Sequence, residues 1–177
     1  RLTDFKSKVS SHYLIKNNGE VVVLVPDLYI AWHAGKSSWK NFKSLNFNSI
    51  GIEISNPGHY FNYKKYSNKQ INSLLNLSKF LINKYKIKSK NILGHSDIAP
   101  DRKKDPGEKF PWSFLAKKKV GLWHSITKQR LKSRRKKTID INHKKKFHEN
   151  LIKIGYLNKK QAKDKLIGFV IKAFQRR

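Results

Sequence analysis

One stretch of the sequence, GHSDIAPDRKKDPGEKFPW at residues 94–112, gathers residue types that could bind a metal ion. His95 and Asp105 offer a nitrogen and an oxygen ligand, a combination that suits zinc. A catalytic zinc site normally takes three protein ligands and keeps one position open for water. Because this stretch supplies only two ligands, the pair also fits a histidine and an aspartate on an ordinary surface loop, and both interpretations stay open.

Two further charged residues could take part in hydrolysis at such a site. Lys103 lies two residues before Asp105, and residues two apart in an extended segment point to the same side. Its cation could therefore stabilise a developing oxyanion. Glu53 stands in the apolar run IGIEI (50–54), where burial would raise its pKa and suit it to general-base catalysis. The alternatives are a solvated lysine and a carboxylate on the wet face of a strand.

Short strands must position these residues. Residues 9–25 predict a hairpin, with Asn18-Gly19 as the turn between two short apolar runs. Residues 50–54 predict a second apolar strand, which carries Glu53. Residues 92–95 predict a third strand that ends at His95, where open sheets place their ligands.

A long helix is expected between these strands. Ser67 and Gln70 form the pattern of a capping box, and apolar residues follow at helical spacing as far as Tyr85. Such a helix packs on a sheet through its apolar side. Strands that alternate with a helix predict an α/β fold, with a mixed central sheet flanked by helices.

Towards the C-terminus the composition changes. Residues 128–146 are strongly basic and predict either a linker or a solvated helix. Apolar periodicity returns from Phe147, but it is too short to fold alone and must pack on the main domain or belong to a larger unit. We expect a main domain at 1–124, a basic linker at 125–146 and a small helical C-terminal segment at 147–177.

The composition narrows the classes of partner and chemistry. A net charge of +29 attracts polyanions such as nucleic acid, anionic lipid or an acidic wall polymer, although a genome rich in lysine codons explains it equally well. The absence of cysteine excludes disulfides, cysteine-ligated zinc and a cysteine nucleophile. No apolar run is long enough for a transmembrane segment, and no helix-turn-helix or aromatic platform supports specific nucleic-acid binding.

Four stretches, in this order, resemble the zinc-dependent N-acetylmuramoyl-L-alanine amidases of type 2, a class related to phage lysozyme-amidases and peptidoglycan recognition proteins. They are SSHYLI (10–15), AWHAGKSSW (31–39), SIGIEI (49–54) and residues 94–112. The resemblance covers residues 1 to about 124 and implies that 1–124 is a catalytic domain. The implied reaction is hydrolysis of the amide between N-acetylmuramic acid and L-alanine, in peptidoglycan or its muropeptide fragments, with one zinc ion per chain.

The resemblance also implies roles for individual residues. His95 and Asp105 match two of the three zinc ligands, Glu53 matches the general base or acid, and Lys103 matches the cation that stabilises the tetrahedral transition state. Five further residues match positions beside the substrate or in the wall of its groove: His12, Trp32, His33, Asn46 and Arg102.

One ligand of the family pattern is missing. It is a histidine at the end of an apolar strand that precedes the SSH motif, and residues 1–11 contain no histidine. Either the strand precedes Arg1 in the natural protein, or His12 or His33 has taken over the coordinating role, or the site is lost and the protein only binds peptidoglycan. We favour the first explanation, because a sheet without that strand keeps an unpaired edge.

The C-terminal segment carries a second, weaker resemblance. LIKIGY (151–156) and AFQ (173–175) resemble part of a small helical peptidoglycan-binding domain, and a plain amphipathic tail is the alternative. A wall-binding segment favours the periplasm or outer membrane of a Gram-negative bacterium, with the cytoplasm as the alternative. An anionic wall or membrane surface is the further partner that the charge suggests.

Overall fold

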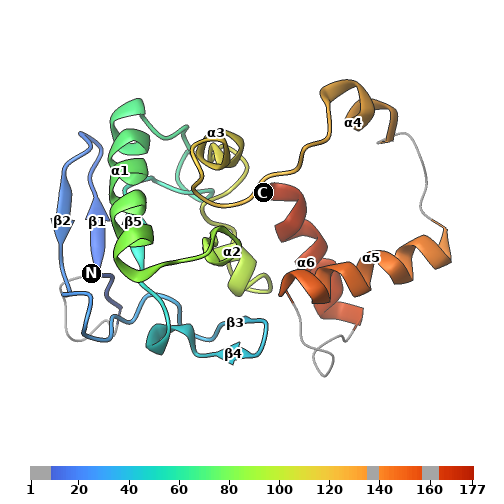
Figure 1. The fold of residues 1–177 in the computed structure, drawn as a ribbon, viewed down its shortest axis with the longest axis horizontal. Coiled ribbons are helices and arrows are strands. Elements are labelled where there is room, and N and C mark those ends of the chain that lie inside the picture. The colour runs from blue at the N-terminus through green and yellow to red at the C-terminus, as the bar shows by residue number, and fades with distance from the viewer. Residues whose placement is uncertain (1–8, 135–139, 157–163) are drawn as a thin grey trace.

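The centre of the fold is a small mixed sheet. The computed structural model describes residues 9–134, 140–156 and 164–177. In this part of the chain the main sheet has the order β2-β1-β5, formed by β2 (Val21–Val23), β1 (Tyr13–Ile15) and β5 (Ile52–Ile54). β1 pairs antiparallel with β2 and parallel with β5, which confirms the predicted mixed sheet (Figure 1).

The predicted hairpin is confirmed. Gly19 has a φ of 88°, a conformation that glycine adopts without steric cost, and its N–H donates to the carbonyl of Lys16 at 2.9 Å. The turn sets the register in which Tyr13 lies opposite Val23. Tyr13 and Ile15 are then both buried, since alternate residues of a strand face the same side.

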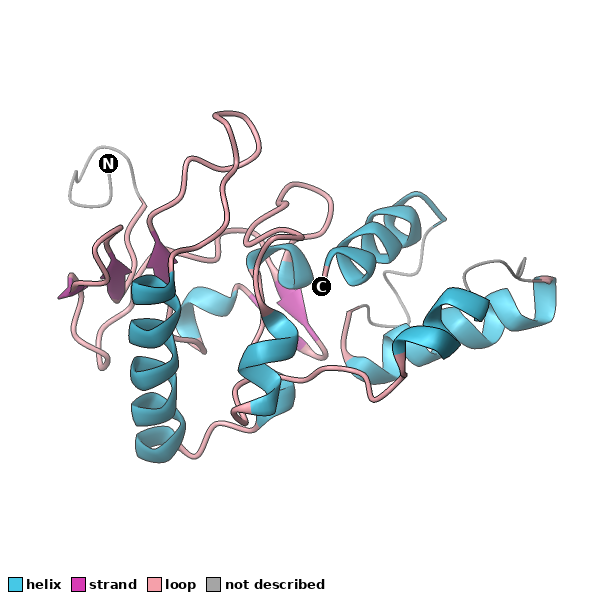
Figure 2. Ribbon diagram, turned by 90° about the horizontal axis from the view of Figure 1, so that it is seen from above, coloured by secondary structure: helices cyan, strands magenta, loops and turns pink. Residues whose placement is uncertain are grey.

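The predicted long helix is α1 (Asn68–Tyr85). The Ser67 hydroxyl accepts a hydrogen bond from the N–H of Gln70, and the Gln70 side chain accepts one from the N–H of Ser67, so the capping box is present. Ile71 and Leu74 pack with Ile15 of β1 in a buried apolar cluster. Figure 2 shows α1 as a separate layer beside the strands.

The prediction of a strand at residues 92–95 is wrong. The chain forms a 3₁₀ turn, η3 (Ser89–Asn91), and then a short helix, α2 (His95–Ile98), so His95 begins a helix instead of ending a strand. The reason is a local cap, because the Asp97 carboxylate accepts a hydrogen bond from the N–H of Gly94 at 2.8 Å. Within the described residues, the edge of β5 that faces away from β1 therefore has no partner strand.

Smaller elements complete the main body. Trp39 lies in a two-stranded hairpin and is buried, as is Trp112 at the start of a short helix. The elements are β3 (Ser38–Trp39), β4 (Phe42–Lys43), η2 (Leu45–Phe47) and α3 (Trp112–Lys117).

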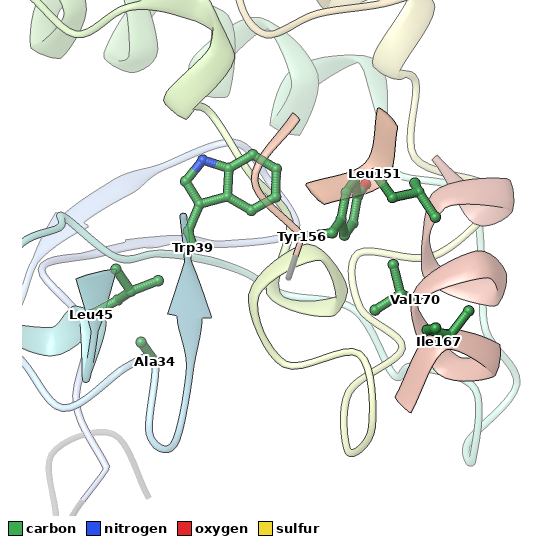
Figure 3. Packing of buried hydrophobic residues seen from close by; sticks show 7 residues of the cluster. All are labelled: Ala34, Trp39, Leu45, Leu151, Tyr156, Ile167 and Val170. Atoms are coloured by element: carbon green, nitrogen blue, oxygen red, sulfur yellow. The ribbon is translucent and has the colours of Figure 1, made fainter. Parts of the chain in front are cut away.

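Three helices follow, and two of them pack on the main body. They are α4 (Lys128–Arg134), α5 (Ile141–Ile154) and α6 (Asp164–Arg176). One buried cluster joins the two parts, which corresponds to the first of the two expected alternatives, packing on the main domain (Figure 3). Its members are Ala34, Trp39 and Leu45 from the main body and Leu151, Tyr156, Ile167 and Val170 from the C-terminal part.

The described parts of the basic region, residues 128–134 and 141–146, are helical and face water. Almost every side chain of α4, and all those at 141–146, are exposed, which agrees with a solvated helix at 128–134 and 141–146. α5 continues across position 146, where we expected the linker to end. Among the residues that the structure describes, no helix is both long and apolar enough to cross a bilayer.

Candidate active site

The site is built around His95 and Asp105. His95 lies in the first turn of α2, and its Nδ1 is 3.1 Å from Oδ2 of Asp105. Two ligand atoms bound at about 2.0–2.2 Å to one tetrahedral ion lie about 3.3–3.6 Å apart, so a small separation of the pair brings it to two positions of a zinc site. Ser96 N–H donates to the carbonyl of Asp105 at 2.8 Å, which fixes the loop of Asp105 against α2.

Glu53 and Lys103 join this pair. A cavity of about 280 Å³ has Glu53, His95 and Asp105 in its lining, together with apolar side chains of β5, α1 and residues 92–93. The Glu53 side chain can be reached by water, yet neighbouring groups displace much of its hydration. Burial therefore raises the pKa of Glu53, and the negative charge of Asp105 raises it further, while His95 and Lys103 act in the opposite direction.

The pKa of Asp105 is shifted the other way. Burial raises it, but the hydrogen bond from His95 and the electrostatic attraction of His95 and Lys103 outweigh burial, so the pKa lies below its ordinary value. Asp105 is therefore a carboxylate, as a metal ligand must be. The half-buried Lys103 supplies a cation beside Glu53 and Asp105, whereas Lys104 lies 5.4 Å above the ring of Tyr60, on another side.

Two tyrosines that the sequence did not single out hold the loop of Asp105. The hydroxyls of Tyr63 and Tyr66 both donate to the carbonyl of Pro106, at 2.7 and 3.0 Å. Tyr63 also accepts a hydrogen bond from the N–H of Lys109 at 3.0 Å. Pro106 directly follows Asp105, so these hydroxyls fix the backbone next to the carboxylate. Both tyrosines are some forty positions away in the sequence, and no local pattern signals the contact.

The imidazole of His12 is fully engaged. His12 is buried, its Nδ1 accepts the N–H of Gly51 at 3.0 Å, and its Nε2 therefore carries the proton that faces the carbonyl of Tyr29 at 3.0 Å. His33 lies edge-on to His12, with Nδ1 at 2.9 Å from the carbonyl of Ala31 and Nε2 at 2.9 Å from Oγ of Ser49. Neither ring offers a free nitrogen to a metal ion, and the described residues contain no group of three candidate ligands.

Of the other predicted substrate residues, Arg102 and Asn46 bind backbone groups, whereas Trp32 is exposed. The Arg102 guanidinium donates to the carbonyls of Ala34 and Lys36, and Asn46 Oδ1 accepts the N–H of Ala34 at 2.7 Å. Both side chains therefore fix the segment next to His95, whose Nε2 lies 3.3 Å from the Ala34 carbonyl. Trp32 is 54% exposed, so its ring is available to a ligand. Direct contacts of these residues with substrate stay predictions.

Gly51 is required by the close approach of His33. A Cβ atom on Gly51 would lie 2.3 Å from Cγ of the His33 ring, so the ring would have to move and give up its hydrogen bonds. We expect Gly51→Ala to lower the free energy of unfolding by about 1–3 kcal/mol in urea denaturation. Gly168→Ala is the control, because nothing lies within 4 Å of its added Cβ. Equal stabilities for the two variants would contradict the packing of His33.

His33 should make the protein less stable in acid. Burial, with smaller contributions from His12 and His95, lowers the pKa of His33 to about 4, although the hydrogen bond to the Ala31 carbonyl acts in the opposite direction. Between pH of about 6.5 and 4, His33 is protonated in the unfolded chain but not in the folded chain. The free energy of unfolding therefore falls as the pH falls, by up to about 3 kcal/mol. His33→Gln should flatten urea-denaturation stability over this window. The same change at the exposed His124 should leave the slope as it is.

Comparison with known proteins shows the family to which the chain belongs. The profile of the N-acetylmuramoyl-L-alanine amidase family matches residues 2–108. The chain belongs to this family. Members of the family are generally zinc-dependent, which agrees with the pair of His95 and Asp105.

Individual amidases extend the likeness. The chain is 43% identical to N-acetylmuramoyl-L-alanine amidase AmiD of Escherichia coli K12 over 136 residues, 69% of this chain and 48% of AmiD. It is 42% identical to 1,6-anhydro-N-acetylmuramyl-L-alanine amidase AmpD of the same strain over 106 residues, 60% of this chain and 56% of AmpD. The chain thus spans about half the length of these curated relatives.

A solved amidase structure has the same fold. It is E. coli AmiD with anhydro-N-acetylmuramic acid-L-Ala-D-gamma-Glu-L-Lys, which matches with a TM-score of 0.81 at 36% identity. The match covers 99% of this chain and 72% of that one, so it includes the C-terminal helices as well as the sheet.

Proposed function

We propose that this protein hydrolyses the amide bond between N-acetylmuramic acid and L-alanine in peptidoglycan or its fragments. The observation that carries the proposal is the convergence of a carboxylate with a raised pKa, a His–Asp pair and a cation. Glu53, His95 and Asp105 line one cavity, and Lys103 acts on the charges of Glu53 and Asp105. The substrate named for the AmiD structure contains the bond in question.

His95 and Asp105 would hold the zinc ion, together with a third ligand that the described residues do not supply. We propose that the third ligand is a histidine on a strand that pairs with the free edge of β5. Two observations support this: β5 has no second partner strand in the described part of the chain, and an apolar-lined cavity lies beside it. The ring nitrogens of His12 and His33 are already hydrogen-bonded, which argues against either residue as the third zinc ligand.

The residues divide the work of hydrolysis. Bound zinc would lower the pKa of a water molecule and polarise the substrate carbonyl. Glu53 takes a proton from the attacking water and returns it to the leaving amine of L-alanine, and its raised pKa favours this exchange. The ammonium of Lys103 stabilises the negative charge that develops on the carbonyl oxygen.

Two measurements test the proposal on the purified protein that includes the strand with the third ligand. Elemental analysis after removal of loosely bound ions should find about one zinc per chain, and release of L-alanine-linked peptides from a muropeptide should follow. The rival is a module that binds peptidoglycan without cleaving it. Co-sedimentation with peptidoglycan but no hydrolysis under added zinc would favour that rival.

The neighbouring lysines provide a matched test of the oxyanion role. We expect Lys103→Ala to lower kcat about 100-fold, because a positioned donor at a developing oxyanion is worth roughly that much. Lys104→Ala removes the same charge from a side chain that lies over Tyr60, and it should leave kcat nearly unchanged. Similar losses of kcat in the two variants would mean that the overall positive charge supports activity and that Lys103 does not act on the oxyanion.

The location and wider partners follow from charge and relatives. AmiD and AmpD come from Escherichia coli, a Gram-negative bacterium. We propose the periplasm or outer membrane as the place of action, with the cytoplasm as the alternative. The exposed basic helix α4 is suited to an anionic wall or membrane surface. Binding of nucleic acid that disappears at moderate salt would reflect counterion release alone.

A further inference from the structure

The C-terminal helices contact the segment that carries His95. Asp97 lies two positions after His95 and is 2% exposed. Its Oδ1 accepts the hydroxyl of Tyr156 at 2.5 Å, and its Oδ2 accepts both the guanidinium of Arg177 and the N–H of Gly94, the latter at 2.8 Å. The Asp97 carboxylate therefore ties the residues around His95 to the ends of α5 and α6.

Arg177 makes two more contacts with the main body, one with the segment before His95 and one with α3. Its Nη2 donates to the carbonyl of Ile92 at 3.0 Å, and its guanidinium lies 4.0 Å from the ring centroid of Trp112. The ion pair with Asp97 is nearly enclosed, with 14% of the Arg177 side chain exposed. Breaking one partner of such a pair leaves an uncompensated buried charge, so the position of Asp97 depends on Arg177.

Tyr156 is itself held against the main body. Its ring meets that of Trp39 edge-on at 5.1 Å, and the carbonyl of Gly155 accepts the N–H of Lys40 at 2.7 Å. A Cβ on Gly155 would lie 2.8 Å from the Trp39 indole, so the approach requires glycine. These contacts fix the position from which the Tyr156 hydroxyl donates its hydrogen bond to Asp97.

A movement of α2 would displace both predicted metal ligands, His95 and Asp105. α2 begins with His95, contacts both β3 and α6, and is bonded to the backbone of Asp105 through Ser96. Figure 1 shows α2 between the main body and α6.

We propose that α5 and α6 brace the active site, with Asp97, Tyr156 and Arg177 as positioning residues that fix the orientation of His95 through α2. The proposal rests on the amidase function proposed above. It assigns the C-terminal helices a part in catalysis itself, whereas the resemblance to a wall-binding domain assigns them only a part in adhesion.

The test compares four variants of the full chain on a soluble muropeptide. Tyr156→Phe removes one hydroxyl, and Arg177→Ala removes the cation. We expect kcat to fall about 10- to 100-fold in both, as when partners of metal ligands are removed, with KM and co-sedimentation with peptidoglycan unchanged. Arg177→Lys should retain more kcat than Arg177→Ala. Lys172→Ala, which removes an exposed cation from α6, should match the parent protein.

Hydrogen exchange gives a readout that needs no turnover. Amides of residues 94–98 should exchange about tenfold faster in Tyr156→Phe, because one buried hydrogen bond is lost, while amides of α1 keep their rates. The brace is refuted if kcat and exchange at 94–98 both stay as in the parent, or if Tyr156→Phe loses only sedimentation. A parent chain without turnover would sink the amidase proposal, and the exchange rates would still decide whether the brace exists.

Discussion

Glu53→Gln is expected to lower kcat on a muropeptide by about 10²- to 10⁴-fold, the usual contribution of a general base. Glutamine keeps the shape of the side chain but cannot accept the proton of the attacking water. The fold should survive, because the Glu53 side chain is exposed on β5 and makes no hydrogen bond on which the sheet depends. Turnover by single-substrate kinetics and the urea midpoint, measured on the same preparation, check both halves of the expectation.

Glu149→Gln is the matched control for this variant. Glu149 is an exposed glutamate on α5 that does not line the cavity, and its replacement removes the same charge. Its kcat should stay at the parent value. Full activity in Glu53→Gln would show that Glu53 is not the general base. Another group would then have to take the proton from the attacking water.

Leu151→Ala is expected to lower the free energy of unfolding by about 2–5 kcal/mol, the range for a leucine deleted from a packed core. Leu151 is 1% exposed and belongs to the cluster that joins the C-terminal helices to Trp39 of the main body. A void there weakens the contact between the two parts, so one urea transition should shift as a whole.

Leu122→Ala is the control, because Leu122 is 52% exposed and its loss should change stability by less than about 0.5 kcal/mol. If Leu151→Ala instead produced a second, early transition and left the main one in place, the C-terminal helices would be an independent unit. The shared core shown in Figure 3 argues for a single transition.

Local chemistry made most of the fold predictable. The turn at Asn18-Gly19 and the capping box of Ser67 act within a few residues, so the hairpin and α1 could be assigned from the sequence. The apolar run before His95 could not be assigned, because so short a run, Ile92 and Leu93 followed by Gly94, fits a strand or a buried turn equally well. The decisive feature was the Asp97 side chain, which caps α2 instead of reaching solvent.

The candidate site was predictable only in its charged residues. His95, Lys103 and Asp105 share one short stretch of sequence, and Glu53 lies in an apolar run, so type and spacing singled them out. The side chains that hold them in place act across long stretches of chain. Tyr66 reaches Pro106 from 40 positions away, a contact that only the tertiary structure creates.

The link between Asp97 and the last helices has a consequence for how the chain folds. Tyr156 and Arg177 come 59 and 80 positions after Asp97. Closing loops of this size costs chain entropy, and proteins rich in distant contacts fold slowly. We therefore expect catalytic competence to appear late in refolding, after α1 and the hairpin. Pulse-labelling with deuterium would show this as protection in α1 before protection at 94–98, and simultaneous protection would argue for one concerted step.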